Sequence, residues 1–470
     1  MKMNMRKIRA GACLTTIVLG LLARTDGAAL LGPVVPISTP DPFAACGAWY
    51  GYLPTPDASV EPMLAVNPVN PANMVAVWCG HGMCGLASST TFDGGSTWLN
   101  QPLPGNGCGY GADPWVSFGP TGAVFAQGWP LSASTDGGGT WSSTGIVPAG
   151  DRPAVTCDPY DARYVYVVWA DLNDGSFVKL NNCAAVIQRS VDGGQTWLPP
   201  VNIHSASGTD FIEGPQIVVQ PDGTLVCAFC EGSFQNNKTA ALSIMRSTDH
   251  GQTWSGPDQA PVQLPVVLPK FQPATGLVTD PDTGHLVETH PFFDSIAVDP
   301  NNGNLYAVWQ DARFSNFQIN AIAFSMSADG GLSWATPMQV NQTPTTIPLL
   351  NQQAWIAKVQ VAADGTVGVA YYDFRNNTPA PGCLTDYWLA YWRPGTGAIT
   401  NAANWREVRL TDASFDIERT PGRSIGDFAY CVGDYNGLSS IGNGFAAVWA
   451  QPYAGTSDQI VFRNVTFPGH

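Results

Sequence analysis

The sequence is poor in charged residues and lacks any sustained helical periodicity. Only 12% of its 470 residues are charged, and no stretch repeats apolar residues at helical spacing. This argues against a helical protein. Glycine (50), proline (38) and aromatic residues (11%) are abundant instead. Because these are turn and strand formers, the composition predicts an all-β protein.

Basic residues and long apolar runs are also scarce. The chain has 21 Lys and Arg against 36 Asp and Glu, a net charge of −15, and such an acidic chain repels nucleic acid and anionic membranes. Its one apolar leader, Ala12 to Ala23, follows basic residues and precedes the small residues Gly27 to Ala29. This pattern predicts that residues 1–29 are a secretory signal peptide. We therefore expect a secreted monomer that neither inserts into membranes nor binds nucleic acid.

Histidine is rare, with six residues, and the cysteines show no metal-binding pattern. Ten cysteines remain after signal cleavage, and an even number in an exported chain predicts disulfides. Cys79–Cys84 and Cys157–Cys183 are the predicted local pairs. Cys227 and Cys230 have the spacing of a redox or zinc site, but they lie in an apolar strand without a second cysteine pair or a nearby histidine. No cofactor is expected, with a structural Ca²⁺ left open.

What the sequence does contain is one eight-residue pattern, present five times. Ser190 to Trp197 reads Ser-Val-Asp-Gly-Gly-Gln-Thr-Trp. Its glycine pair supplies the positive φ of a tight hairpin, its Asp accepts backbone N–H groups, and its Trp begins the next strand. The other copies are Thr91 to Trp98, Ser134 to Trp141, Ser247 to Trp254 and Ser327 to Trp334. The pattern predicts a hairpin and requires no ligand.

Four predicted strands accompany each copy, and seven such units follow one another. This organisation predicts a seven-bladed β-propeller with four-stranded antiparallel blades. Units six and seven lack the octapeptide. Unit seven, with its first strand predicted at Phe428 to Val432, has only three strands, so Val34 to Ser38 is predicted to close the ring. Residues 30–59 form a Pro-rich lead, and residues 60–470 form a single domain.

The octapeptides resemble the Asp-box, or BNR, repeats of bacterial sialidases. The resemblance implies a sialidase-like propeller and an exo-glycoside hydrolase. In that family, three arginines hold the sugar carboxylate, a Tyr paired with a Glu is the nucleophile, and an Asp is the acid. Sialidases carry Phe/Tyr-Arg-Ile-Pro before the first box and usually have six blades. Here the corresponding stretch, Val60 to Met63, has no arginine.

Charged residues recur at the two positions of each unit that a propeller brings to one face. Carboxylates precede the predicted first strands at Glu61, Asp113, Asp151, Glu213, Asp294 and Asp427, and Arg152 follows Asp151. After the second strands come Asp171, Asp311-Ala312-Arg313 and Asp373-Phe374-Arg375. The last unit contributes Arg419, Arg423, Asp434 and Tyr435. Crowded carboxylates push one another's pKa apart, and arginine forks bind carboxylates. A polar funnel that binds a sugar is one interpretation, and ion pairs that only tie loops together are the other.

The substrate-binding candidates are Arg152, Arg313, Arg375, Arg423 and Asp311. The catalytic candidates are Asp113, Glu213 and Asp373, with Tyr372 as nucleophile. The predicted function is a secreted, sialidase-like glycoside hydrolase acting on a glycan or glycoconjugate. The alternative is a non-catalytic propeller that binds a glycan or a protein at the cell surface. A polysaccharide lyase is a third option, against which the scarcity of paired histidines argues.

Overall fold

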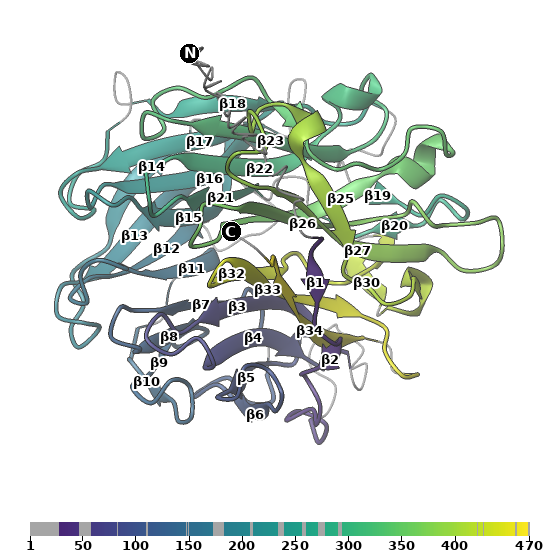
Figure 1. Cartoon of the computed structure of the whole chain (residues 1–470). Helices are drawn as coiled ribbons and strands as arrows, with labels where there is room; N and C mark the ends of the chain where they lie inside the picture. The colour runs from purple at the N-terminus through teal and green to yellow at the C-terminus, as the bar shows by residue number, and fades with distance from the viewer. Residues whose placement is uncertain are drawn as a thin grey trace, which may run out of the picture.

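The computed structural model describes most of the chain, and its described part is all-β (Figure 1). The described residues run from 28 to 468, with gaps at 47–57, 82, 110, 147, 149, 173–182, 207–209, 234–238, 256–259, 271–277, 290–293, 421, 426 and 456–457. The helices in these residues are short 3₁₀ turns at Arg313–Ser315, Leu349–Gln352, Ala402–Asn404 and Ile417–Arg419. Within this part of the chain, no helix is long and apolar enough to span a membrane.

Four sheets in the first half of the chain share one antiparallel order, in which each strand pairs with the next along the sequence. The first contains β3 (Val60–Val66), β4 (Met74–Gly80), β5 (Gly85–Thr91) and β6 (Leu99–Pro102). The second contains β7 (Trp115–Phe118), β8 (Val124–Gln127), β9 (Ser132–Ser134) and β10 (Ser142–Ser143). The third contains β11 (Asp151–Cys157), β12 (Val165–Asp171), β13 (Ala184–Ser190) and β14 (Val201–Ser205). The fourth contains β15 (Asp210–Val219), β16 (Leu225–Ser233), β17 (Thr239–Ser247) and β18 (Val262–Val266).

Three further sheets continue this order. One contains β21 (Asp294–Val298), β22 (Leu305–Asp311), β23 (Ala321–Ser327) and β24 (Met338–Gln339). The next contains β25 (Ala354–Val361), β26 (Val367–Asp373), β27 (Leu384–Trp392) and β28 (Arg406–Arg409), with β29 (Phe415–Asp416) also on β27. The last contains β32 (Gly437–Ile441), β33 (Gly444–Gln451) and β34 (Gln459–Thr466). Successive sheets follow one another around the molecule in Figure 1.

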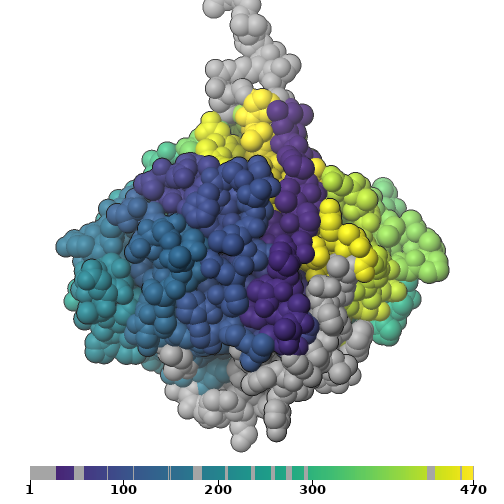
Figure 2. Space-filling view, turned by 90° about the horizontal axis from the view of Figure 1, so that it is seen from below, coloured from purple at the N-terminus to yellow at the C-terminus, as the bar shows by residue number. Residues whose placement is uncertain are grey.

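The last sheet is completed by the N-terminal segment. The strands β1 (Leu30–Leu31) and β2 (Val35–Pro36) both pair antiparallel with β34. Figure 2 shows this purple segment lying between the blue first sheet and the yellow C-terminal strands. Val35 and Pro36 belong to the segment Val34 to Ser38 that was predicted to complete the last unit. This segment therefore pairs with the last strand, β34.

One prediction about the last sheet is wrong. Phe428 to Val432 was expected to be its first strand, but β31 (Asp427–Tyr430) pairs with β30 (Gly422–Ile425) and β20 (Leu286–Val287) in a separate sheet that also includes β19 (Val278–Thr279). The first strand is instead β32, whose Gly-Leu-Ser-Ser-Ile sequence is too polar to suggest a buried strand. The long connection between the fourth and fifth sheets thus contributes two strands, β19 and β20, to this extra sheet.

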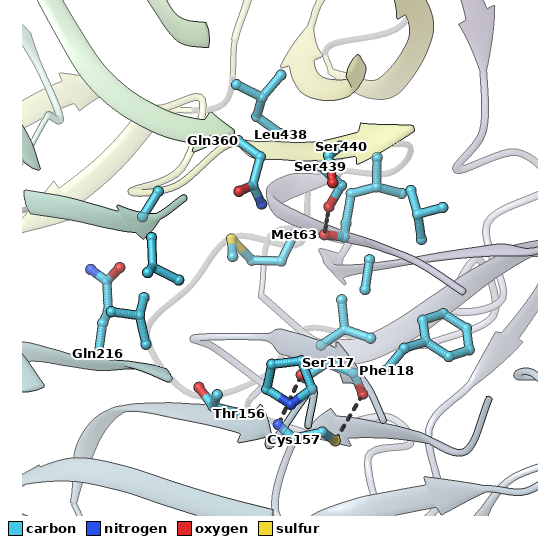
Figure 3. A pocket seen from close by; sticks show the side chains of 18 of the residues that line it. Met63, Ser117, Phe118, Thr156, Cys157, Gln216, Gln360, Leu438, Ser439 and Ser440 are labelled. Carbon is cyan, nitrogen blue, oxygen red and sulfur yellow. Dashed lines mark hydrogen bonds between the residues drawn. The ribbon is translucent and has the colours of Figure 1, made fainter. Parts of the chain in front are cut away.

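The first strands of the seven sheets contact one another in sequence. β3 contacts β7, and the contacts continue through β11, β15, β21, β25 and β32, which in turn contacts β3. All seven strands contribute to the lining of one cavity of about 380 Å³. Figure 3 shows Met63, Gln216 and Gln360, from three different strands, around this space. The structure therefore has a central cavity between its innermost strands.

The octapeptides form the predicted turns between the third and fourth strands. In Ser190–Trp197, Asp192 Oδ1 accepts the Thr196 backbone N–H at 2.8 Å, and its Oδ2 accepts the Thr196 hydroxyl at 2.5 Å. Ser190 Oγ accepts the Gly194 N–H at 2.8 Å. Hydrogen bonds to the hydroxyl and backbone of the partner threonine hold the pKa of Asp192 near 2. These bonds hold the Asp, hydroxyl and glycine groups of the turn internally, as the sequence predicts.

The two predicted local disulfides are wrong. Cys79 donates its thiol to Glu61 Oε2 at 3.1 Å, and Cys157 donates its thiol to the Ser117 carbonyl at 3.4 Å. The structure instead joins Cys46 to Cys108, 62 positions apart. Cys157 and Cys183 remain buried thiols. Sequence proximity misled the prediction because neighbouring cysteines in these strands have their own partners.

Candidate active site

A repeated backbone irregularity marks the start of the first strands. The pairing register shifts between Val60 and Met63, between Asp151 and Ala154, and between Glu213 and Gln216. Such β-bulges re-aim side chains and commonly lie beside active sites. Glu61, Asp113 and Arg152 within or near these positions have φ of 58°, 56° and 50°. Left-handed backbone is costly for residues with a side chain, and it persists where surrounding structure holds it, as at functional sites.

Seven side chains converge at this end of the first strands and are called the Arg152 cluster. They are Glu61, Asp113, Asp151, Arg152, Glu213, Asp434 and Tyr435.

Arg152 connects three carboxylates from three parts of the chain. Its Nε lies 3.6 Å from Asp151 Oδ2, its Nη1 lies 3.7 Å from Glu213 Oε2, and its Nη2 lies 3.4 Å from Asp434 Oδ2. The side chains of Arg152, Glu213 and Asp434 are all buried. A buried charge requires partners of opposite sign, so these contacts hold the guanidinium in place.

A second set of contacts joins Tyr435 to the first two sheets. The Tyr435 hydroxyl donates a short hydrogen bond to Asp113 Oδ1. The Asp113 backbone N–H in turn donates to Glu61 Oε2 at 3.0 Å. The Tyr435 ring also meets Trp115 edge to face, with centroids 6.2 Å apart. Tyr435 is thereby held with its oxygen against a carboxylate that can accept its proton.

Burial and neighbouring charges shift the pKa values of titratable groups in the cluster. Burial raises the pKa of Asp151 to about 7, Arg152 opposes this shift, and the charges of Asp113, Glu213 and Asp434 add to it. Burial also raises the pKa of Glu213, again opposed by Arg152. Burial and Asp113 raise the pKa of Tyr435 well above its usual value. Asp151 can therefore carry a proton near neutral pH, which is what a general acid requires.

Exposure distinguishes two members of the cluster. Asp151 and Tyr435 are partly exposed, whereas Asp113 and Glu213 are buried. A small cavity beside the cluster is lined by Arg152, Asp434 and Tyr435 together with Trp115 and Lys358. The Lys358 ammonium lies 4.4 Å from the centre of the Trp115 ring, and both residues also line the central cavity. The cluster thus lies at one end of the central cavity.

The predicted pair Asp311 and Arg313 has a different position. Arg313 Nη2 lies 2.8 Å from Asp311 Oδ2 and also donates to the Pro265 carbonyl. Asp311 Oδ2 accepts the Val267 backbone N–H and the Trp309 indole N–H as well. These contacts tie the segment after β18 to β22. Neither Asp311 nor Arg313 is among the residues lining the cavity at Arg152.

Arg375 and Asp373 also pair within their own sheet region. Arg375 Nε donates to Asp373 Oδ2 at 2.5 Å, its Nη1 pairs with Glu407, and its guanidinium stacks 3.8 Å from the centre of the Trp388 ring. Asp373 Oδ2 accepts the Thr343 hydroxyl at 2.7 Å. The predicted four-arginine clamp is therefore not assembled by these contacts, since Arg313 and Arg375 bind local carboxylates.

Tyr372 is fully buried, and its hydroxyl donates to the Ala450 carbonyl at 2.8 Å. Burial raises the pKa of Tyr372 well above its usual value. Its position supports a packing role between sheets, not attack on a substrate. Arg423 lies in β30, and its side chain, like those of Asp294 and Asp427, lies outside the described residues.

The sequence prediction located Asp113, Arg152 and Glu213. It named Asp434 and Tyr435 in the last unit but assigned neither a role. Both precede β32, which was misplaced. The available signal was the rule already used for the other sheets, a charged residue just before the first strand. Applied to Gly437–Ile441, that rule selects Asp434 and Tyr435.

Metal binding has no geometric support in the part of the chain that the structure describes. No group of three or more His, Cys, Asp or Glu side chains there is arranged to hold a metal ion. The Arg152 cluster contains many carboxylates, but a guanidinium occupies the position between three of them.

Comparison with known proteins gives a fold and no sequence family. No family model matches the chain, and no curated protein matches it. A protein of unknown function from Dyadobacter fermentans is similar over 93% of this chain and 99% of its own, with 12% identity and a TM-score of 0.51.

Two further solved structures have lower scores. A Hadza microbial sialidase is 15% identical over 87% of this chain and 66% of its own, with a TM-score of 0.44. A Penicillium chrysogenum α-L-arabinanase is 13% identical over 87% of this chain and 93% of its own, with a TM-score of 0.42. The structural neighbours of the chain thus include a sialidase and an arabinanase. At these identities the likeness concerns the fold alone.

Proposed function

We propose that the protein is a secreted glycoside hydrolase that cleaves neutral glycans at the Arg152 cluster. One observation carries this proposal: two partly exposed side chains, Asp151 and Tyr435, lie together at one end of the central cavity. Burial raises the pKa of Asp151 to about 7, and the Tyr435 hydroxyl is hydrogen-bonded to Asp113. An acid and an assisted nucleophile are the two groups that cleavage of a glycosidic bond requires.

In the proposed reaction, Tyr435 attacks the anomeric carbon while Asp113 takes the phenolic proton. Asp151 donates its proton to the leaving oxygen as the glycosidic bond breaks. Water then cleaves the glycosyl–tyrosine bond, with Asp151 accepting a proton from that water. Asp113 returns its proton to the departing Tyr435 oxygen, which restores the phenol and both carboxyl groups to their starting states. Because burial raises the pKa of Tyr435, the phenolate does not exist at rest, so Asp113 must act during the attack.

A neutral substrate follows from the charge of the site. Arg152 is already engaged by Asp151, Glu213 and Asp434. A sugar carboxylate would compete with these groups and would meet the surrounding negative charge. We therefore propose a neutral glycoside in place of the sialoside that the motif resemblance implies.

The proposed architecture is a seven-bladed ring closed by the N-terminal strand. The contacts from β3 around to β32 and back, and the pairing of β1 and β2 with β34, support it. We also propose that residues 1–29 are a signal peptide for export, of which residues 1–27 lie outside the described part of the chain. The Cys46–Cys108 disulfide is consistent with export. A single domain over residues 60–470 and a monomeric state are likewise proposed.

The test is turnover of neutral aryl glycosides and of an aryl sialoside by the purified protein. We expect hydrolysis of at least one neutral glycoside, none of the sialoside, and loss of turnover in Asp151→Asn. Asp161→Asn is the matched control, because Asp161 pairs with the exposed Arg163. Turnover of the sialoside alone would contradict the neutral substrate. Full activity of Asp151→Asn would contradict the assigned acid.

A non-catalytic binding propeller is the second candidate. The observation that favours it is that Arg152 is buried and bound by carboxylates of the chain itself, as in a structural ion-pair network. Binding on a glycan array without any turnover would select this candidate.

A further inference from the structure

The sheet β25–β28 lacks the octapeptide turn and has a longer connection in its place. Trp392 pairs with Val367 as Ser327 pairs with Leu305, so Trp392 occupies the position where an octapeptide would begin. The chain then runs through residues 393–405, including the 3₁₀ turn Ala402–Asn404, before β28. This connection therefore replaces the Asp-centred turn in this sheet.

Arg393 at the start of this connection is a buried cation without a polar partner. The residue is 3% exposed, and none of its three guanidinium nitrogens has a hydrogen-bond partner. In the described residues no carboxylate forms an ion pair with it, and its guanidinium carbon lies 5.6 Å from the centre of the Phe467 ring. Arginine stays charged at physiological pH, and burying an unpaired charge is costly. Such a group indicates a missing anion.

Arg393 lines a cavity whose wall also contains polar side chains. It has a volume of about 250 Å³ and is lined by Tyr391, Arg393, Thr396, Asn404 and Arg406, together with Ala28, which belongs to the proposed signal peptide and would be absent from the mature protein. Tyr391 and Arg406 are direct cross-strand neighbours of β27 and β28. Arg406 Nη1 donates to the Ala403 and Trp405 carbonyls, which fixes the guanidinium at the rim. Two arginines at one cavity create local positive charge on a chain whose net charge is −15.

We propose that this cavity binds an oxyanion, a sulfate, phosphate or carboxylate group, through Arg393 and Arg406. Arginine forks match the oxygens of such groups. The site is distinct from the Arg152 cluster. Because successive strands are antiparallel, the connection between third and fourth strands lies at the opposite end of the sheet from the start of the first strand. The proposal therefore does not depend on the hydrolase activity.

The experiment is calorimetric titration and thermal unfolding of the full chain with sodium sulfate, sodium phosphate or sodium glucuronate, against sodium chloride at equal ionic strength. Binding of sulfate or phosphate but not glucuronate would identify the ligand as a sulfate or phosphate group. Binding of glucuronate would identify it as the carboxylate of an acidic sugar. We expect Arg393→Met to weaken binding by about tenfold or more, the loss of one charge-assisted contact of about 1.4 kcal/mol. We expect Arg406→Gln to weaken it less, because Arg406 is at the rim.

Two comparisons separate binding from general salt effects and from misfolding. Sulfate stabilises proteins non-specifically, so Arg163→Gln, which alters an exposed arginine, must keep the full wild-type response. In chloride, Arg393→Met should unfold at or above the wild-type temperature, because it removes an unpaired buried charge. Equal responses of wild type and Arg393→Met to all three anions would overturn the proposal. A loss of stability in Arg393→Met that is the same in every salt would also overturn it.

Discussion

The Tyr435 hydroxyl donates its hydrogen to Asp113, although 322 positions separate the two residues. Tyr435 precedes β32 and Asp113 precedes β7, and both strands contact β3. The candidate site therefore exists only when the last sheet packs against the first. Its chemistry and the assembly of the fold are linked through this bond.

The first prediction concerns that hydroxyl. Tyr435→Phe removes the nucleophile and its bond to Asp113 while keeping the ring that packs on Trp115. We expect hydrolysis to fall by about 100-fold or more, since an acid–base or nucleophilic group contributes on this order. Steady-state kinetics measures the effect, and Tyr160→Phe, which changes an exposed tyrosine, should leave kinetics unchanged. Wild-type turnover by Tyr435→Phe would remove Tyr435 from the mechanism.

The second prediction concerns the stability of the Arg152 cluster. Arg152→Met leaves Glu213 and Asp434 buried without their cation, so we expect a loss of about 3–5 kcal/mol in the free energy of unfolding. Urea denaturation measures this value. The matched Arg163→Met variant breaks an exposed pair with Asp161 and should cost at most about 1 kcal/mol. Equal losses in the two variants would show that the cluster is not a buried charge network.

The third prediction is a pH dependence. The pKa of Asp151 is raised to about 7, so the folded protein binds this proton more strongly than the unfolded chain does. Its contribution to stability is full below the unfolded pKa of about 4 and is lost as the pH rises toward 7. Activity that needs the protonated acid should fall as the pH rises through about 7. A pH–rate profile tests this, and a profile in which activity instead rises through that range would exclude Asp151 as the acid.

The fourth prediction separates the two glycines of one octapeptide. A Cβ at Gly194 would lie 2.5 Å from Phe125 ring atoms, whereas a Cβ at Gly193 would come no closer than 3.4 Å to the Ala162 oxygen. Both glycines have left-handed backbone, which costs other residues about 1–2 kcal/mol. We expect Gly194→Ala to lose about 1–3 kcal/mol more than Gly193→Ala because of overpacking. Denaturant unfolding of the two variants gives the difference, and identical midpoints would refute the steric argument.

The fifth prediction concerns the N-terminal lead. The Cys46–Cys108 disulfide closes a loop of 62 positions, and chain-entropy arguments assign about 4 kcal/mol to such a loop. The double variant Cys46→Ser and Cys108→Ser should therefore lower the free energy of unfolding by up to this amount. Cys157→Ser replaces a buried thiol that bonds to the Ser117 carbonyl and should cost less. If both variants matched the wild type, the disulfide would not restrain the lead.

Local chemistry made part of this protein predictable from its sequence. The five octapeptides fold as predicted because each Asp, hydroxyl and glycine completes its turn with residues no more than four positions away. The strand rhythm, and the charged residues at Asp113, Arg152 and Glu213, follow from the same local repetition. The closing pairing was also foreseen, since a three-stranded unit leaves an edge that another strand must cover.

Tertiary structure alone decided which charged residues meet. Arg313 and Arg375, like Arg152, follow an aspartate in the sequence. Each of the two pairs with the aspartate two positions before it, whereas Arg152 lies at a bulge and contacts Glu213 and Asp434 as well as Asp151. Asp434 and Tyr435 were named from the sequence, but their contacts with Arg152 and Asp113 depend on the polar strand β32 lying among the innermost strands. Neither the direction of a bulged side chain nor the pairing of a weakly apolar strand is encoded locally, because both depend on contacts between distant parts of the chain.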